Sequence, residues 1–201
     1  MNPASDTAPA ATPRGTAFLM SMMDEVQHYF MNELEGGIAA HAGRPEAWAF
    51  VGMNVELALA QLGFARGFFP AGAAPAFLDC GAGLGFIGML ARGLGFRPSG
   101  IELSRRYVEL AGKLFPWAQV REGDVLTYAD YGEHDAIFYY GPFKDETLQA
   151  QFEQKVEAEA KSGAIIIANR KVSAAWSRST RFRLLRDDGF MGCIIQKVHA
   201  A

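Results

Sequence analysis

A glycine-rich stretch, FLDCGAGLGFIG at residues 77–88, constrains the fold more than any other part of the chain. A short apolar run leads to Asp79 and Cys80, and glycines follow at positions 81, 83, 85 and 88. Because glycine has no Cβ and adopts positive φ freely, such a turn can bring the backbone close to a ligand. A helix that begins there directs unpaired N–H groups and the positive end of its dipole into the same space. The stretch therefore predicts a buried strand, a tight turn and a helix around a nucleotide-type pocket.

The overall composition narrows the class of protein. The chain has 201 residues, half of them hydrophobic and a fifth charged, which suits one soluble domain with a sizeable core. The net charge of −3 gives no general attraction to nucleic acid or anionic membranes. The two cysteines, Cys80 and Cys193, form no CxxC pattern, so we expect a reducing, cytoplasmic setting. The four histidines lack ligand spacing, and we expect no metal.

The pattern of apolar residues divides the chain into three parts. Residues 1–15 are rich in Pro, Ala, Ser and Thr and read as a disordered tail without the features of a secretory signal. Residues 16–70 contain two amphipathic helical patterns, at 16–40 and 45–63, and predict a helical cap. Residues 68–75 read as a linker, and residues 76–201 as the main domain.

From residue 76 onward, strand patterns alternate with helical ones. The predicted strands are residues 76–80, 98–102, 118–121, 135–140, 163–168 and 191–198, and the predicted helices are residues 84–95, 105–115, 144–161 and 173–188. This alternation predicts an α/β fold, a Rossmann-like and mostly parallel sheet of six or seven strands with helices on both faces. The segment before the last strand is ambiguous, because Asp188-Gly189 also suits a hairpin between residues 181–186 and 191–198. We favour the helix, since Phe182 and Leu185 share one helical face.

Three acidic residues follow the first three predicted strands. Glu102 ends the second strand, where a carboxylate can accept hydrogen bonds from both hydroxyls of a ribose. Asp124 follows the third strand and can accept from an adenine amine, while the Val125 N–H faces the ring. Asp79 can accept from a ligand ammonium group. Each acid also has an ordinary alternative, as a solvated strand end or as a residue that orders its own turn.

The order of these motifs resembles that of the class I S-adenosylmethionine-dependent methyltransferases. The motifs are DCGAGLG, GIELS, EGDV and DAIFYY, and the resemblance covers about residues 76–198. It implies a seven-stranded sheet with an antiparallel last strand and S-adenosylmethionine as the cofactor. It implies that Asp79 and the glycines Gly81, Gly83 and Gly85 hold the methionine part, that Glu102 binds the ribose, and that Asp124 and Val125 bind the adenine. Little chain remains after residue 168 for both of the final strands.

Two other functions stay open. Gly83, Gly85 and Gly88 fit the GxGxxG pattern of dinucleotide-binding proteins, so a nicotinamide-dependent oxidoreductase is one alternative. The acid two residues before the first glycine, and EGD after the third strand, favour the methyl donor. The second alternative is a binding module that holds S-adenosylmethionine without catalysis.

The methyl acceptor is less constrained than the cofactor. The fourth strand ends in YYGPF at residues 139–143, a partial match to the Asp/Asn-Pro-Pro-Tyr/Phe loop of amino-methylating relatives. We predict that the Tyr140 hydroxyl orients the acceptor and that Phe143 stacks on it, with aromatic packing as the alternative for both. Within the cap, Trp48, Met53 and Asn54 are candidates for lining the acceptor pocket.

Two further segments bear on the class of acceptor. LSRRYVELAG and SGAIIIANRKVSAAW also resemble the lysine methyltransferases of the ATP synthase c-subunit type, which implies a protein lysine as the acceptor. A basic run at residues 170–186 suits RNA phosphates or, in preference, a solvated helix face. We therefore favour a protein lysine or a small molecule over RNA, and expect no membrane partner.

Overall fold

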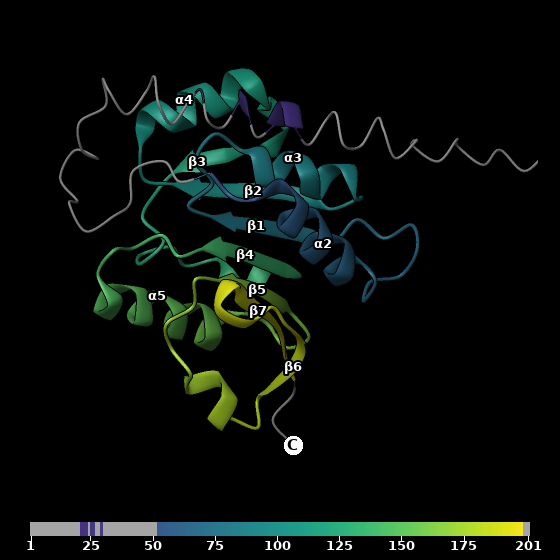
Figure 1. Ribbon diagram of the computed structural model, residues 1–201, viewed down its shortest axis with the longest axis vertical. Helices are drawn as coiled ribbons and strands as arrows, with labels where there is room; N and C mark the ends of the chain where they lie inside the picture. Colours follow the sequence, from purple (N-terminus) through teal and green to yellow (C-terminus); the bar gives the residue numbers. More distant parts are fainter. Residues whose placement is uncertain (1–20, 24, 27–28, 30–51, 199–201) are drawn as a thin grey trace, which may run out of the picture.

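The computed structural model describes residues 21–23, 25, 26, 29 and 52–198, and these form a seven-stranded sheet flanked by helices (Figure 1). The strand order is β3-β2-β1-β4-β5-β7-β6. The strands are β1 (Ala76–Cys80), β2 (Arg97–Glu102), β3 (Val120–Glu122), β4 (Ala136–Tyr140), β5 (Ile165–Asn169), β6 (Phe182–Asp187) and β7 (Gly192–Lys197). Neighbouring strands are parallel except at β7, which is antiparallel to both β5 and β6. The predicted fold class is confirmed, with seven strands.

Helices cover both faces of the sheet. The helices are α2 (Val55–Arg66), α3 (Phe86–Gly93), α4 (Arg105–Leu114) and α5 (Glu146–Glu159). Alternate strand residues divide the core into two clusters: Phe77 and Phe138 pack with α2, α3 and α4, whereas Leu78 and Ile137 pack with α5. Because both faces are covered, every residue of β1 and β5 is buried, which explains why both strands are mostly apolar.

Helix α2 differs in its bounds from the predicted helix at residues 45–63. It begins after Asn54, whose Oδ1 accepts a hydrogen bond from the Leu57 N–H at 2.8 Å, and it ends at Arg66. Asparagine is a favourable N-cap because it satisfies one of the unpaired N–H groups of the first turn. α2 packs against α3 and β5, so this part of the predicted cap belongs to one helical layer of the sheet.

Most of the remaining cap and the predicted tail lie outside the described residues, as does Trp48. Residues 21–23, 25, 26 and 29 are helical, within the predicted helix at 16–40. None of the helices in the described part of the chain has the length and apolar character needed to cross a bilayer.

The predicted helix at residues 173–188 is wrong, and the alternative hairpin is correct. A short 3-10 helix, η3 (Ala175–Arg178), is followed by β6, which pairs with β7 through a bulge between Leu184 and Arg186. Phe182 packs in the cluster beside α5, and Leu185 packs against the opposite cluster. Their spacing therefore reflects the two faces of a strand rather than one face of a helix. Both final strands are present, and the basic run is not a helix face.

Candidate functional site

The carboxyl ends of the parallel strands meet along one edge of the sheet. Asp79 lies one residue before the end of β1, and Glu102, Tyr140 and Asn169 are the last residues of β2, β4 and β5. The turn between β6 and β7 reaches the same edge, because Gly192 pairs with Asn169. Ligands of open α/β sheets bind outside this edge, so the geometry brings most of the predicted site residues to the expected place.

The glycine turn crosses directly from β1 to α3. Gly81, Gly83 and Gly85 have φ values of +83°, +52° and +84°, a region that other residues rarely adopt. The N–H groups of Gly81 and Ala82 donate to the Ile101 carbonyl at 2.9 and 3.0 Å, which folds the turn over the end of β2. The backbone conformation therefore favours glycine at the three predicted positions.

Two of the glycines also have packing roles. A Cβ at Gly85 would lie 3.5 Å from the Phe115 and Val120 side chains, so this glycine lies against α4 and β3. A Cβ at Gly88 would lie 3.3 Å from the Ala118 Cβ, which is tighter than ordinary van der Waals contact. Gly88 thus allows close approach of α3 to the sheet, as the third glycine of a GxGxxG pattern does.

Asp79 is an unsatisfied buried acid. Its side chain is 3% exposed and its Oδ2 has no hydrogen-bond partner. Burial, with a smaller contribution from the negative charge of Glu102, raises the pKa of Asp79 to about 8. Because a buried polar atom without a partner costs free energy, the arrangement is suited to a cationic ligand that restores the charge balance.

Glu102 links the end of β2 to the glycine turn. Its Oε2 accepts from the Gly83 N–H and its Oε1 from the Ser104 N–H, both at 2.8 Å, and the residue is 6% exposed. A carboxylate has about four lone-pair sites, so accepting these two bonds leaves capacity for further donors. Ser104 stands at the N-cap position of α4, but its side chain makes no capping bond.

Asp124 and Val125 form the turn after β3. Asp124 is half-buried, and its Oδ1 accepts from the Leu126 N–H at 2.9 Å, which is the local turn-ordering role of an aspartate. Val125 is buried, and its carbonyl accepts from the Tyr131 hydroxyl at 2.6 Å. The predicted contacts of both residues with an adenine remain predictions.

The loop after β4 places Tyr140 and Phe143 in different surroundings. Tyr140 is half-buried at the sheet edge, and the Arg170 guanidinium lies 5.6 Å from its ring centroid. Gly141 has φ +47°, and a Cβ there would lie 2.8 Å from the Arg170 Cβ, so the two loops are in close contact. Phe143 is 7% exposed and packs on Phe152 of α5 at 6.1 Å between ring centroids. The environment of Phe143 is thus that of a core residue, and stacking on an acceptor remains a prediction.

A buried amide pair at the same edge was not predicted. Asn169 and Gln61 are fully buried and exchange two hydrogen bonds, of 2.8 and 3.0 Å. The Gln61 amide also donates to Asp188 Oδ2 at 2.8 Å. The pair joins α2 to the end of β5 and to the β6–β7 turn. Because 108 residues separate the two amides, no local pattern indicates their contact.

Comparisons with known proteins identify the fold. No protein-family model and no curated protein matches the sequence. Among solved structures, an O-methyltransferase from Bacillus cereus in complex with SAH matches with a TM-score of 0.57 and 17% identity, over 89% of this chain and 91% of that chain. An RNA methyltransferase from Salinibacter ruber in complex with S-adenosyl-L-homocysteine matches with a TM-score of 0.53 and 18% identity, over 74% and 92%.

A third match is the ribosomal protein L11 methylase from Lactobacillus delbrueckii subsp. bulgaricus, with a TM-score of 0.53 and 17% identity over 70% of this chain and 78% of that one. These similarities show that the chain has the fold of the class I S-adenosylmethionine-dependent methyltransferases, as its motifs predict.

Proposed function

We propose that the protein is an S-adenosylmethionine-dependent methyltransferase. The observation that supports this most strongly is Asp79, a buried acid with an unpartnered oxygen at the tip of β1. S-adenosylmethionine has an ammonium group on its methionine part, and that group would supply the missing donor and positive charge. A nicotinamide dinucleotide has no ammonium group to offer at this position.

The other polar groups of the edge fit the remaining parts of the same cofactor. The turn at Gly81 and Gly83 would bring the backbone close to the methionine part. Glu102, already fixed by the Gly83 and Ser104 N–H groups, would accept from the ribose hydroxyls. Asp124 and Val125 would contact the adenine beyond β3.

The chemistry requires little from the protein beyond alignment. When bound, the cofactor supplies an electrophilic methyl group, and the reaction is an in-line displacement that needs no covalent enzyme intermediate. The protein must hold the acceptor atom close to the methyl group and in line with it, which is a contribution of position and orientation. The loops after β4 and β5 bound the side on which the acceptor would approach, with Tyr140 as the candidate for orienting it.

The class of methyl acceptor is proposed from the sequence resemblance rather than from the geometry of the site. The matched structures include enzymes that act on RNA and on a ribosomal protein, so the fold is compatible with several classes. The sequence resemblance to the c-subunit-type lysine methyltransferases is the reason to test protein lysine first, with small molecules next and RNA last.

Transfer of a labelled methyl group tests the proposed activity. Wild-type protein and labelled S-adenosylmethionine are incubated separately with a protein extract, a small-molecule extract and an RNA extract. We expect label in one of the three, its loss in Asp79→Asn, and its retention in the matched control Asp130→Asn, whose side chain is exposed. Binding of S-adenosylhomocysteine without label in any extract would favour the non-catalytic binding module. Binding of NAD alone would favour the oxidoreductase.

A further inference from the structure

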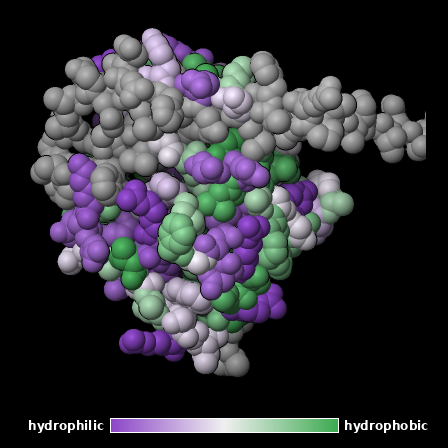
Figure 2. Space-filling view, viewed as in Figure 1, coloured by the Kyte–Doolittle hydropathy of each residue, from purple (hydrophilic) through white to green (hydrophobic). Residues whose placement is uncertain are grey.

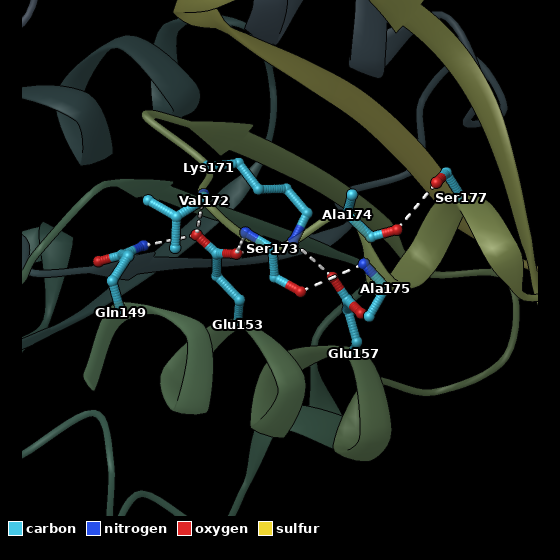
Figure 3. A network of polar contacts seen from close by, with 9 residues as sticks. All are labelled: Gln149, Glu153, Glu157, Lys171, Val172, Ser173, Ala174, Ala175 and Ser177. Carbon is cyan, nitrogen blue, oxygen red and sulfur yellow. Dashed lines mark hydrogen bonds and ion pairs between the residues drawn. The ribbon is translucent and has the colours of Figure 1, made fainter. Parts of the chain in front are cut away.

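A buried carboxylate outside the cofactor edge connects α5 to the loop after β5 (Figure 3). Glu153 of α5 is fully buried. Its Oε1 accepts from Gln149 Nε2 and from the Val172 N–H, both at 2.9 Å. Its Oε2 accepts from the Ser173 N–H at 2.7 Å and from Lys171 Nζ at 2.9 Å. Each oxygen therefore accepts one hydrogen bond from a backbone N–H of the loop after β5 and one from a side chain.

The network extends to both loops on the proposed acceptor side. Gln149 is buried and its Oε1 accepts from the Phe143 N–H at 3.2 Å, so the loop after β4 is attached through Gln149 to Glu153. Lys171, whose side chain is 5% exposed, also pairs with Glu157 Oε1 at 2.6 Å. The Glu153 carboxylate thus fixes residues 172 and 173 directly, and residue 143 indirectly through Gln149.

The need for this carboxylate follows from the connection between β5 and β6. Between β5 and β6 the chain forms only the short helix η3, and neither the Val172 nor the Ser173 N–H donates to a backbone carbonyl of the described residues. Both hydrogen bonds are partly buried, and Glu153 supplies the acceptor to these two consecutive residues. The ion pair of Glu153 with Lys171 is not needed for stability in itself, because replacing a buried ion pair with apolar residues is often neutral or stabilising. The charged cluster is therefore better explained by the geometry that it imposes.

We propose that Glu153 is a positioning residue for methyl transfer: it holds the loops after β4 and β5 in the arrangement that receives the acceptor. This inference rests on the proposed function. It does not involve the cofactor-side residues, since Asp79 and Glu102 lie at the carboxyl ends of β1 and β2, whereas the loops of the network follow β4 and β5. Loss of Glu153 should therefore impair transfer while leaving cofactor affinity intact.

The test uses Glu153→Gln, with Glu159→Gln as the matched control on the same helix. Glu159 forms a surface ion pair with Lys155, within one turn of α5. In Glu153→Gln, an amide nitrogen replaces one carboxylate oxygen. The nitrogen can only donate, so it faces the donors that the oxygen accepts from in the wild type. We expect at least tenfold faster deuterium exchange in the loops after β4 and β5, at least tenfold slower labelling of the extract that wild type labels, and S-adenosylhomocysteine affinity within twofold of wild type. The control should match wild type in all three.

A second variant separates positioning from stability. The triple replacement of Glu153, Glu157 and Lys171 by Met removes the whole buried charge cluster together and should recover part of the thermal stability that Glu153→Gln loses. It leaves the Val172 and Ser173 N–H groups without their acceptor, so the loops should still exchange fast and transfer should stay low. Transfer that recovers together with stability would overturn the proposal, as would unchanged loop exchange or unchanged transfer in Glu153→Gln.

The same experiments distinguish this proposal from the function it rests on. A wild-type protein that binds no S-adenosylhomocysteine overturns the proposed function and, with it, the acceptor role of the loops. A wild-type protein that binds it but labels no extract also overturns the positioning role, because there is then no acceptor to position. Normal cofactor binding and transfer in Glu153→Gln overturn only the positioning.

Discussion

Binding of S-adenosylmethionine should release a proton from Asp79. The carboxyl has a pKa of about 8 in the free protein, because it is buried and lies near Glu102. At pH 7 about 0.9 of the Asp79 side chains are then protonated. The ammonium group of the ligand favours the carboxylate, so its arrival should lower the pKa and expel about 0.9 proton per ligand at pH 7.

Affinity should rise with pH for the same reason. Between pH 5.5 and 7.5, below the usual titration of an α-amino group near 8, the ionised fraction of a group with pKa 8 rises roughly 80-fold. The association constant for S-adenosylmethionine should rise by a similar factor. Titration calorimetry in buffers of different ionisation enthalpy measures both the affinity and the number of protons released. No proton release at pH 7, or an affinity that does not change with pH, would refute the assignment of Asp79 as the ammonium ligand.

The Asp79→Asn variant provides the complementary measurement. A carboxyl whose pKa is raised on folding contributes stability that is fully present below its unfolded pKa, near 4, and that is lost as the pH rises through about 8. The wild-type protein without ligand should therefore lose thermal stability relative to Asp79→Asn between pH 5 and pH 8.5. The variant should bind S-adenosylmethionine more weakly and without proton release. Parallel stability profiles of the two proteins would contradict the burial of an ionisable acid here.

Three further substitutions test other parts of the site. Glu102→Ala should weaken S-adenosylmethionine binding by roughly 1–3 kcal/mol, measured by calorimetry, and an unchanged affinity would exclude it as the ribose ligand. Gly83→Val places a β-branched residue at φ +52° in the predicted cofactor turn, and should abolish binding while circular dichroism shows the fold retained; normal binding would show that the backbone does not approach the ligand there. Gln61→Leu removes the hydrogen bonds that Gln61 donates to Asn169 Oδ1 and Asp188 Oδ2, and should lower the free energy of unfolding in urea by about 1–3 kcal/mol; a neutral result would show that the pair is dispensable.

The sequence predicted the elements whose signals are local. The first strand, residues 76–80, was predicted with its observed bounds, because a fully buried parallel strand is an apolar run that ends at a glycine turn. The segment at 182–187 was mispredicted because its structure depends on pairing with β7. The bulge and the two-sided packing of Phe182 and Leu185 imitate helical spacing, and only the tertiary partner distinguishes the two.

The candidate site likewise has parts that local sequence signals predict and parts that depend on tertiary contacts. The sequence could place Asp79 and Glu102 beside the glycine turn, because an acid at the carboxyl end of a strand has a defined position relative to that turn. Their contacts with a cofactor remain predictions. On the face shown in Figure 2 the described hydrophilic and hydrophobic residues are mixed, so the character of this face gives no further indication of the acceptor. The Glu153 network could not be predicted, because Gln149, Glu153 and Glu157 repeat at a spacing typical of a solvated helix stripe. Their burial results from a loop that lies about twenty residues further along the chain and has no helical pattern of its own.

The most direct test of the central claim is a binding titration of the wild-type protein at pH 7.5 with S-adenosylmethionine, S-adenosylhomocysteine and NAD in parallel. We expect saturable one-to-one binding of the first two, with no detectable binding of NAD. Binding of NAD with no response to either of the other ligands would contradict it.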